Sequence, residues 1–340
     1  MTGATLLRAA RAPRRSAEHR LLHLDPLAGT WHDRPFAALP EAFRYGDLLV
    51  VNDAATLPSS LRLTSHEGEL RLVGRDGERR FRAVVFGPGD FRTPTELRGE
   101  APPLGEGDRV RSGSLEAAVV AVDPDAPRLV GLEFALGGAE LLAALYREGR
   151  VIQYAYVEQP LELWDVQNRF AGRPWAFEPP SAGLPLTFGL LESLRARGVR
   201  IAWLSHAAGI SSTGSAALDR RLPFPERYEI PAATIEALAS AREHGARVVA
   251  VGTTVVRALE DSALLHGFPR AGPGEARLIL GPGFRPRVVN GILTGMHEPS
   301  TSHYSLLEAF APRRQLERAT AAAGRLDYLQ HEFGDSLLIL

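Results

Sequence analysis

Gly252, Thr253 and Thr254 have the residue types and the place in the chain to bind oxygen atoms of a ligand. They follow a short apolar run of β-branched residues, Val248–Val251, and precede apolar residues that recur at helical spacing between 255 and 264. A turn between a buried strand and a helix offers free N–H groups and the positive end of the helix dipole. The two hydroxyls add further donors. An ordinary strand-to-helix turn with a threonine cap is the alternative interpretation, and on these residues alone it is the better one.

Other predicted strands also end in polar or flexible residues. In an open α/β sheet, ligands gather beyond the carboxyl ends of the strands. The residues at these ends are Asn52 and Asp53, Ser205 and His206, Gly281 to Gly283 after a strand expected at 278–280, and Thr294 to His297. Each also has a plain structural explanation, because polar residues commonly end a strand and open a turn. His297 and His303 lack the spacing of two metal ligands on a helix, so no metal site is expected.

Two loops that precede predicted helices add further candidates. The proline-rich loop at 178–187 could present Ser181 and Thr187 near a helix N-terminus. The segment Glu226–Pro231 places two carboxylates and the phenol of Tyr228 ahead of another helix. A charged loop with an N-terminal cap explains this second segment equally well.

Composition narrows the chemistry that these residues can support. At 340 residues, with 45% hydrophobic and 23% charged residues, the chain is typical of a globular protein with two domains. Its basic residues are all arginine, which excludes a lysine Schiff base and the lysine of a Walker phosphate loop. The absence of cysteine excludes disulfides, thiolate metal sites and cysteine nucleophiles. A net charge of −1 does not by itself indicate a nucleic-acid partner.

The elements that must position these residues predict an α/β fold with a second lobe. Strands alternate with helices of 10–15 residues in the second half, which favours a largely parallel sheet covered by helices on both faces. Short alternating runs between 61 and 134, separated by Gly-, Pro- and Asp-rich turns, favour a small antiparallel β-barrel-like insert. The predicted α/β domain therefore comprises 1–60 and 135–340. No signal-peptide core and no apolar run of ~18 residues is present, so we expect a cytoplasmic protein without membrane contact.

Seven ordered segments make the chain resemble a known enzyme family. They are Gly46–Asp53, Pro180–Leu184 with Thr187, Leu191–Ile201, Glu226–Pro231, Val251–Glu260, Pro282–Val289 and Phe333–Asp335. The chain resembles the S-adenosylmethionine:tRNA ribosyltransferase-isomerases of queuosine biosynthesis, and the resemblance covers nearly its whole length. This resemblance implies an α/β domain with an inserted β-barrel lobe, in agreement with the pattern of the elements.

The resemblance also implies a reaction. Members of the family transfer the ribosyl carbons of S-adenosylmethionine to the aminomethyl group of a 7-deazaguanine in tRNA and rearrange them to an epoxycyclopentane, giving epoxyqueuosine, while adenine and methionine leave. A base must then remove a proton next to the sulfonium, and the pocket must exclude water. His206 and His297 align with family histidines and are the candidate bases, with Glu229 as a third candidate.

The substrate contacts implied by the resemblance centre on the 252–254 turn. Thr253, Thr254 and Arg257 would hold the polar edge of the ligand, and Arg257 is suited to the carboxylate of its methionyl part. The other residues expected to bind substrate are Asn52, Asp53, Ser181, Gly183, Thr187, Tyr228, Gly252, Gly283 and Arg287. No metal and no cofactor beyond S-adenosylmethionine is expected, and the sequence does not indicate an oligomeric state.

Departures from the family pattern keep other functions open. Ala54-Ala55, Ser59-Ser60, Pro185 and Ser300 stand where the family has other residues, with a loss of three arginines and one histidine. Arginine contacts to phosphate supply much of the affinity for RNA, so tRNA is the partner most affected. The alternatives are a paralogue that cleaves or rearranges S-adenosylmethionine or a related adenosyl compound with a small-molecule acceptor or none, and a non-catalytic binding protein on the same scaffold.

Overall fold

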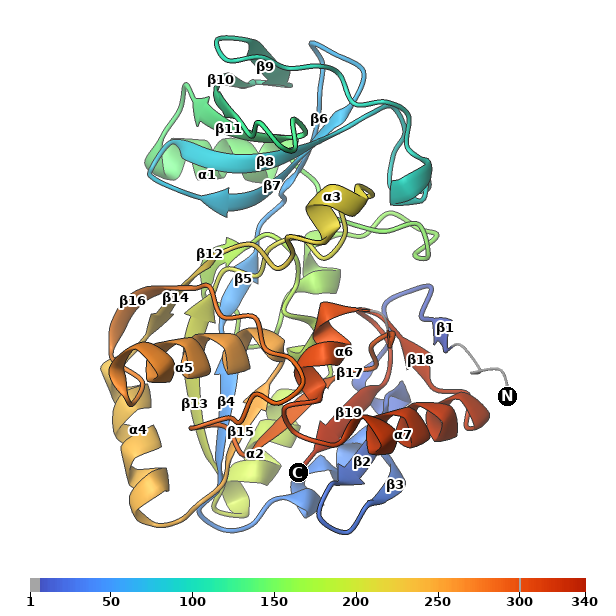
Figure 1. Cartoon of the computed structure of the whole chain (residues 1–340), viewed down its shortest axis with the longest axis vertical. Helices are drawn as coiled ribbons and strands as arrows, with labels where there is room; N and C mark the ends of the chain where they lie inside the picture. Colours follow the sequence, from blue (N-terminus) through green and yellow to red (C-terminus); the bar gives the residue numbers. More distant parts are fainter. Residues whose placement is uncertain (1–6, 300) are drawn as a thin grey trace.

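The computed structural model describes residues 7–299 and 301–340, which form two lobes (Figure 1). The larger lobe is built on a nine-stranded sheet in the order β16-β14-β13-β4-β15-β17-β19-β2-β3. Its strands are β2 (Arg20–Asp25), β3 (Thr30–Pro35), β4 (Leu48–Asn52), β13 (Arg200–His206), β14 (Glu226–Ile230), β15 (Val248–Val251), β16 (Gly272–Ala276), β17 (Gly291–Gly295) and β19 (Ser336–Ile339).

The sheet is mixed, so the prediction of a largely parallel sheet is not confirmed. The four central strands β13, β4, β15 and β17 run parallel, as does the pair β19–β2. The other four pairings are antiparallel. The strands β2 and β3 are joined by four residues, and so short a connection can only form a hairpin. The alternation of strands and helices thus predicts the centre of the sheet and not its edges.

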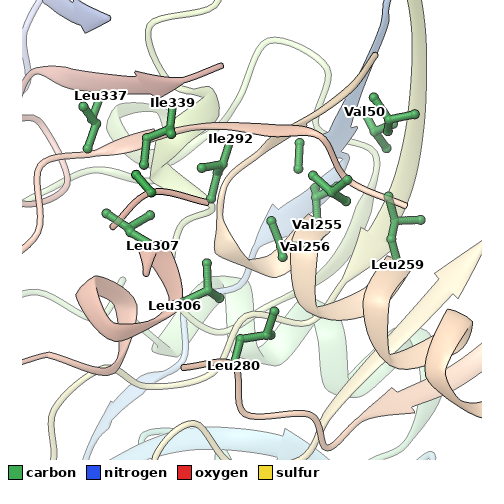
Figure 2. Packing of buried hydrophobic residues seen from close by; sticks show 14 of the residues in the cluster. Val50, Val255, Val256, Leu259, Leu280, Ile292, Leu306, Leu307, Leu337 and Ile339 are labelled. Atoms are coloured by element: carbon green, nitrogen blue, oxygen red, sulfur yellow. The ribbon is translucent and has the colours of Figure 1, made fainter. Parts of the chain in front are cut away.

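Alternate residues of the central strands enter two separate cores. Leu48 and Val50 pack on the face covered by α4 (Ala232–Glu243), α5 (Thr253–His266), α6 (Ser302–Leu307) and α7 (Arg313–Arg325), part of which Figure 2 shows. Leu49 and Val51 pack on the opposite face, against the 3₁₀ helix η2 (Phe36–Ala42) and α2 (Phe188–Ala196). Burial on both faces explains why these strands are continuous apolar runs. Each fully buried leucine contributes about 2 kcal/mol to folding.

The predicted strand–turn–helix at 248–266 is confirmed. Strand β15 is entirely buried, and α5 ends where Gly267 adopts a left-handed conformation with φ of 81°. By contrast, the strand expected at 278–280 is wrong. The strand in this region is β16, and beyond it the N–H groups of Arg277 and Leu278 donate to Asp261 instead of to a neighbouring strand.

The smaller lobe is a six-stranded antiparallel, barrel-like sheet, as the sequence predicts. Its order is β6-β7-β8-β11-β10-β9, and every neighbouring pair is antiparallel. The strands are β6 (Ser60–Arg62), β7 (Glu69–Arg75), β8 (Arg80–Phe86), β9 (Arg109–Ser112), β10 (Leu115–Val122) and β11 (Leu129–Phe134). Helix α1 (Gly138–Glu148) packs its buried Leu141 and Leu145 on this sheet.

Short elements connect the lobes and complete the fold. Strand β5 (Ala54–Thr56) pairs with β12 (Arg173–Ala176) between the lobes, where Figure 1 also places α3 (Ala216–Asp219). Strand β1 (Arg8–Ala9) pairs with β18 (Leu329–Gln330). Among the described residues, no helix has the length and apolar character needed to cross a membrane.

Candidate active site

A cavity of about 510 Å³ lies at the carboxyl ends of β15 and β17. Its wall is formed by the segments 178–182, 208–212, 251–254, 294–298 and 301–303, with further residues from 154–156 and 331–332. This is the edge of the sheet at which ligands are expected in an α/β fold. Of the residues proposed from sequence, Ser181, Gly252, Thr253, Thr254, Arg257 and His297 line the cavity.

The turn at 252–254 is open to a ligand. Gly252 has φ of 88°, a conformation that favours glycine, and a Cβ there would lie 3.4 Å from Ala182. No side chain caps α5 at Gly252, so the threonine cap of the alternative interpretation is not present. The N–H groups of the first turn therefore stay available to ligand oxygens. The Thr254 hydroxyl accepts a hydrogen bond from Asn52 Nδ2 at 3.3 Å.

Asn52 positions the turn and does not itself line the cavity. Its side-chain oxygen accepts the N–H of His206 at 2.9 Å, and its Nδ2 donates to the His206 carbonyl at 3.0 Å. One buried amide thus ties β4 to β13 and reaches Thr254 on α5. This explains why a polar residue ends an otherwise apolar strand.

His297 is the histidine whose position fits a proton acceptor. It lines the cavity, and its Nε2 lies 2.7 Å from Thr294 Oγ1. Its ring stacks on that of His303 with centroids 5.1 Å apart. Burial lowers the pKa of His297 well below its ordinary value, and the neighbouring His303 lowers it further. Burial lowers the pKa of His303 to about 4. Both rings are therefore neutral at pH 7, and each has one ring nitrogen with an unprotonated lone pair.

His206 lies behind the cavity wall. It is completely buried, and its Nε2 is 3.6 Å from Glu226 Oε2. Burial, followed by the charge of Arg257, lowers the pKa of His206 well below its ordinary value. Since it does not line the cavity, this predicted base does not reach a ligand there. β-strand alternation explains the difference, because the backbone of His206 is near the site while its ring points into the protein.

Arg257 lines the cavity with a guanidinium that already has partners. It forms an ion pair with Glu226 and donates to the carbonyls of Ala276 at 3.0 Å and Leu278 at 3.1 Å. Burial lowers the pKa of Arg257 to about 10, so it stays cationic at neutral pH. Arg257 therefore pairs with Glu226 of the protein, where the sequence predicted a carboxylate of the ligand. Its hydrogen bonds connect α5 to β16 and to the segment that follows β16.

Glu229, Tyr228 and Asp53 do not line the cavity. Glu229 pairs with Arg173 at 2.5 Å, and this hydrogen bond lowers the pKa of the carboxyl. Tyr228 is buried in the core of the α4–α7 face. Asp53 accepts the Ser205 hydroxyl at 2.5 Å, and burial raises the pKa of this carboxyl. These residues lie near the edge of the sheet, but their side chains do not point into the cavity.

The remaining predicted residues have structural roles near the site. Gly183 packs so closely on Asn168 that a Cβ would lie 2.8 Å from its amide oxygen. Thr187 caps α2 by accepting the N–H of Leu190 at 3.2 Å. The N–H of Arg287 donates to Glu260 at 2.8 Å, and Gly283 lies in the exposed loop before it. None of these four lines the cavity as described by residues 7–299 and 301–340.

An aromatic and acidic wall of the cavity was missed from sequence. The rings of Tyr154 and Tyr156 stack at 6.0 Å, and Tyr156 stacks on His331 at 4.2 Å. The phenol of Tyr154 donates to Glu178 at 2.5 Å, and that of Tyr156 donates to Glu332. These residues come from loops without a periodic pattern. The position of Glu178 directly before the recognisable Pro-Pro-Ser-Ala-Gly segment was the one available signal.

The fold and the cavity define a two-lobed α/β protein with a candidate ligand site at the edge of its larger sheet. The chain belongs to the queuosine biosynthesis protein family, because the sequence model of that family matches residues 5–339. It is 32% identical to the S-adenosylmethionine:tRNA ribosyltransferase-isomerase of Geobacter sulfurreducens, over 94% of this chain and 92% of that protein. The protein of the same name from Sorangium cellulosum is 36% identical, over 89% of this chain and 87% of its own length.

A solved structure is similar across both lobes. The crystal structure of S-adenosylmethionine tRNA ribosyltransferase from Thermotoga maritima has a TM-score of 0.53 and 25% sequence identity. The alignment covers 98% of this chain and 96% of the other. The structural match therefore includes the smaller lobe as well as the larger one.

Proposed function

We propose that the protein is an S-adenosylmethionine:tRNA ribosyltransferase-isomerase. It transfers the ribosyl part of S-adenosylmethionine to 7-aminomethyl-7-deazaguanine in tRNA and isomerises it to give epoxyqueuosine. The observation that carries this proposal is identity above 30% to proteins of that name over nearly the whole chain. The cavity at the 252–254 turn supports it with a site of suitable size for a nucleoside.

The cavity residues suggest how the first step proceeds. The sulfonium makes the adjacent C5′ protons acidic, and His297 is a neutral acceptor on the cavity wall. The proton moves to a ring nitrogen of His297, and Thr294 Oγ1, 2.7 Å from Nε2, holds the ring in orientation. The free N–H groups of α5 and the hydroxyl of Thr254 bind the polar oxygens of the ribose or methionyl part.

A cluster of arginines beside the lobe junction supports tRNA as the partner. Arg227 lies 3.7 Å from the ring centroid of Trp175, and Arg173 lies 5.3 Å from it. Partial burial lowers the pKa of Arg227, and the positive charges of Arg75 and Arg173 lower it further. Cations gathered around an aromatic ring suit a phosphate backbone with exposed bases.

A second candidate function is favoured by the charge of the cavity itself. Its lining holds five carboxylates and one guanidinium among the described residues. This balance suits a small cationic acceptor better than a polyanion. The alternative reaction is cleavage or rearrangement of S-adenosylmethionine, or of a related adenosyl compound, with a small-molecule acceptor or none.

Release of adenine and methionine separates the two functions. We expect purified protein to release both from S-adenosylmethionine when tRNA carrying 7-aminomethyl-7-deazaguanine is added, and not when it is omitted. Nucleoside mass spectrometry of the digested tRNA should then reveal epoxyqueuosine. Release at the same rate without RNA would favour the second function in its acceptor-free form. No release in either case would refute the tRNA reaction and the acceptor-free reaction.

A further inference from the structure

Glu178 is a mostly buried carboxylate on the wall of the cavity. Only 9% of its surface is exposed. The Tyr154 hydroxyl and the N–H of Ser211 both donate to Oε1, at 2.5 and 3.1 Å. Among residues 7–299 and 301–340, no hydrogen bond is donated to Oε2. Because Glu178 lines the cavity, this oxygen is free to accept a hydrogen bond from a ligand.

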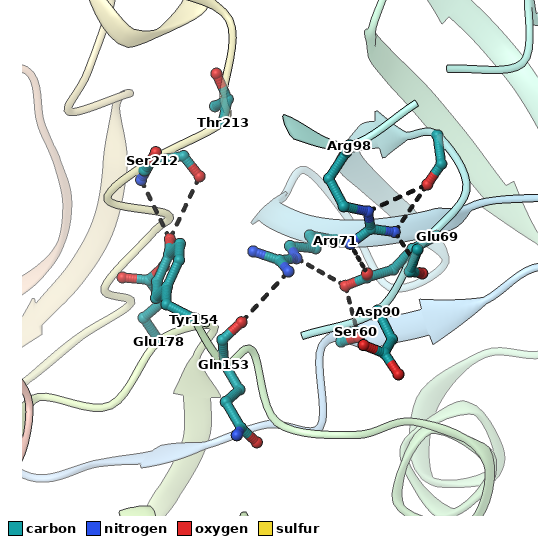
Figure 3. A network of polar contacts seen from close by, with 12 residues as sticks. Ser60, Glu69, Arg71, Asp90, Arg98, Gln153, Tyr154, Glu178, Ser212 and Thr213 are labelled. Carbon is teal, nitrogen blue, oxygen red and sulfur yellow. Dashed lines mark hydrogen bonds and ion pairs between the residues drawn. The ribbon is translucent and has the colours of Figure 1, made fainter. Parts of the chain in front are cut away.

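Tyr154, whose hydroxyl donates to Glu178, has several other polar contacts of its own. Tyr154 accepts a hydrogen bond from the N–H of Ser212 at 3.2 Å (Figure 3). It also accepts one from the hydroxyl of Ser211 at 3.2 Å. The guanidinium of Arg71 lies 5.4 Å from its ring centroid and donates to the carbonyl of Gln153 at 3.4 Å. The orientation of Glu178 is therefore fixed before a ligand enters.

Arg71 is part of a buried ionic group in the smaller lobe. Glu69 accepts hydrogen bonds from Arg71 and from Arg98, both at 2.7 Å. Figure 3 shows this group beside Gln153 and Tyr154. The smaller lobe thus helps to position a residue of the cavity wall.

The charges around Glu178 call for a cation. Of the five cavity carboxylates, Glu226 is paired with Arg257, and Asp219 accepts two hydrogen bonds from Thr213. Within the part of the chain that the structure describes, Glu178 forms no ion pair with an arginine, and the negative charge of Glu332 raises its pKa. A positively charged ligand group would relieve this repulsion and donate to Oε2.

We propose that Glu178 accepts a proton from the ammonium group of the acceptor, with Tyr154 as its positioning residue; this rests on the proposed function. An alkyl ammonium has no lone pair with which to attack a carbon atom. One N–H proton moves to Oε2, so the carboxylate becomes a carboxylic acid and the ammonium becomes a neutral amine. The N–H bond breaks and the O–H bond forms, while the electron pair stays on nitrogen as the lone pair that the later carbon–nitrogen bond requires.

The acidity of Glu178 suits this role. Burial raises the pKa of Glu178 to about 7, and the charge of Glu332 raises it while the hydrogen bond from Tyr154 lowers it. A carboxylate with this pKa is a stronger base than an ordinary one and is still ionised in slightly alkaline solution. Arg71 also interacts electrostatically with Glu178, whose negative charge raises the pKa of the guanidinium after burial and Glu69 have acted on it.

The experiment compares Glu178→Gln with wild type in the tRNA reaction. We expect kcat/KM for tRNA carrying 7-aminomethyl-7-deazaguanine to fall about 100-fold or more. The Kd for S-adenosylmethionine, measured by calorimetry, should change less than about twofold, because Oε2 serves the acceptor. Glu158→Gln is the matched control, since Glu158 is an exposed carboxylate that pairs with Arg11 at 3.0 Å.

The pH profile distinguishes a proton acceptor from a structural carboxylate. Wild-type kcat/KM should rise with pH through about 7, and this rise should be absent in Glu178→Gln. Tyr154→Phe removes a hydrogen bond that lowers the pKa of Glu178, so its profile should move to higher pH. The inference would be overturned if Glu178→Gln had the same kcat/KM as wild type. It would also be overturned if the pH profile of Tyr154→Phe were the same as that of wild type. Failure of wild type to modify tRNA would instead refute the proposed function.

Discussion

The free energy of unfolding of Glu178→Gln, relative to that of wild type, is expected to be larger in alkaline solution than in acid. Burial raises the pKa of Glu178 from its ordinary 4.5 to about 7 in the folded protein. The folded state therefore retains a proton that the unfolded chain releases, and this stability is full below pH 4.5 and is lost as pH rises through 7. The change corresponds to about 3 kcal/mol of unfolding free energy. Glutamine keeps a carbonyl acceptor for Tyr154 and does not titrate.

Urea denaturation followed by tryptophan fluorescence measures this effect at a series of pH values. The quantity of interest is the free energy of unfolding of Glu178→Gln minus that of wild type, because other titrating groups cancel in the difference. It should increase by about 3 kcal/mol between pH 4.5 and pH 8. A difference that stays constant over this range would refute the reasoning that burial dominates the environment of Glu178.

Four further predictions test other parts of the site. Thr254→Val should weaken binding of S-adenosylmethionine about tenfold in calorimetry, because the cavity loses one hydroxyl partner; unchanged affinity would exclude Thr254 as a contact. His297→Asn should lower the rate of adenine release about 100-fold or more with little change in that affinity, and a rate equal to wild type would exclude His297 as the base. Arg257→Ala should destabilise the fold by about 3–5 kcal/mol in urea, because it leaves Glu226 buried without its partner; wild-type stability would mean that the ion pair is unimportant. Arg227→Glu should weaken tRNA binding and reduce its salt dependence, and an identical salt slope would place tRNA elsewhere.

The central strands and the helix after β15 could be predicted from the sequence, because short-range patterns of apolar residues and glycine determine them. The apolar run at 248–251 is buried on both faces, and the helix after it ends at Gly267, where a left-handed conformation favours glycine. The edges were decided by tertiary pairing. Residues 278–280 have a strand-like sequence, yet their backbone is held by Asp261 from α5, a contact that no local pattern encodes.

The candidate site was predicted in part for a related reason. Motif position located Thr254 and His297, which line the cavity. It could not tell which way a side chain points, and so His206 was predicted from a backbone that reaches the site while its ring does not. Tyr154 and Glu178 meet only after the chain has folded, and neither stands in a periodic pattern. Their role depends on burial, which composition does not encode.

Isotope transfer from S-adenosylmethionine to tRNA tests the central claim most directly. Two preparations, one labelled in the ribosyl carbons and one in the methyl group, are incubated with the protein and tRNA carrying 7-aminomethyl-7-deazaguanine. The proposed function predicts that ribosyl label enters the tRNA and that methyl label does not. Methyl label in the tRNA, or no label from either preparation, would contradict it.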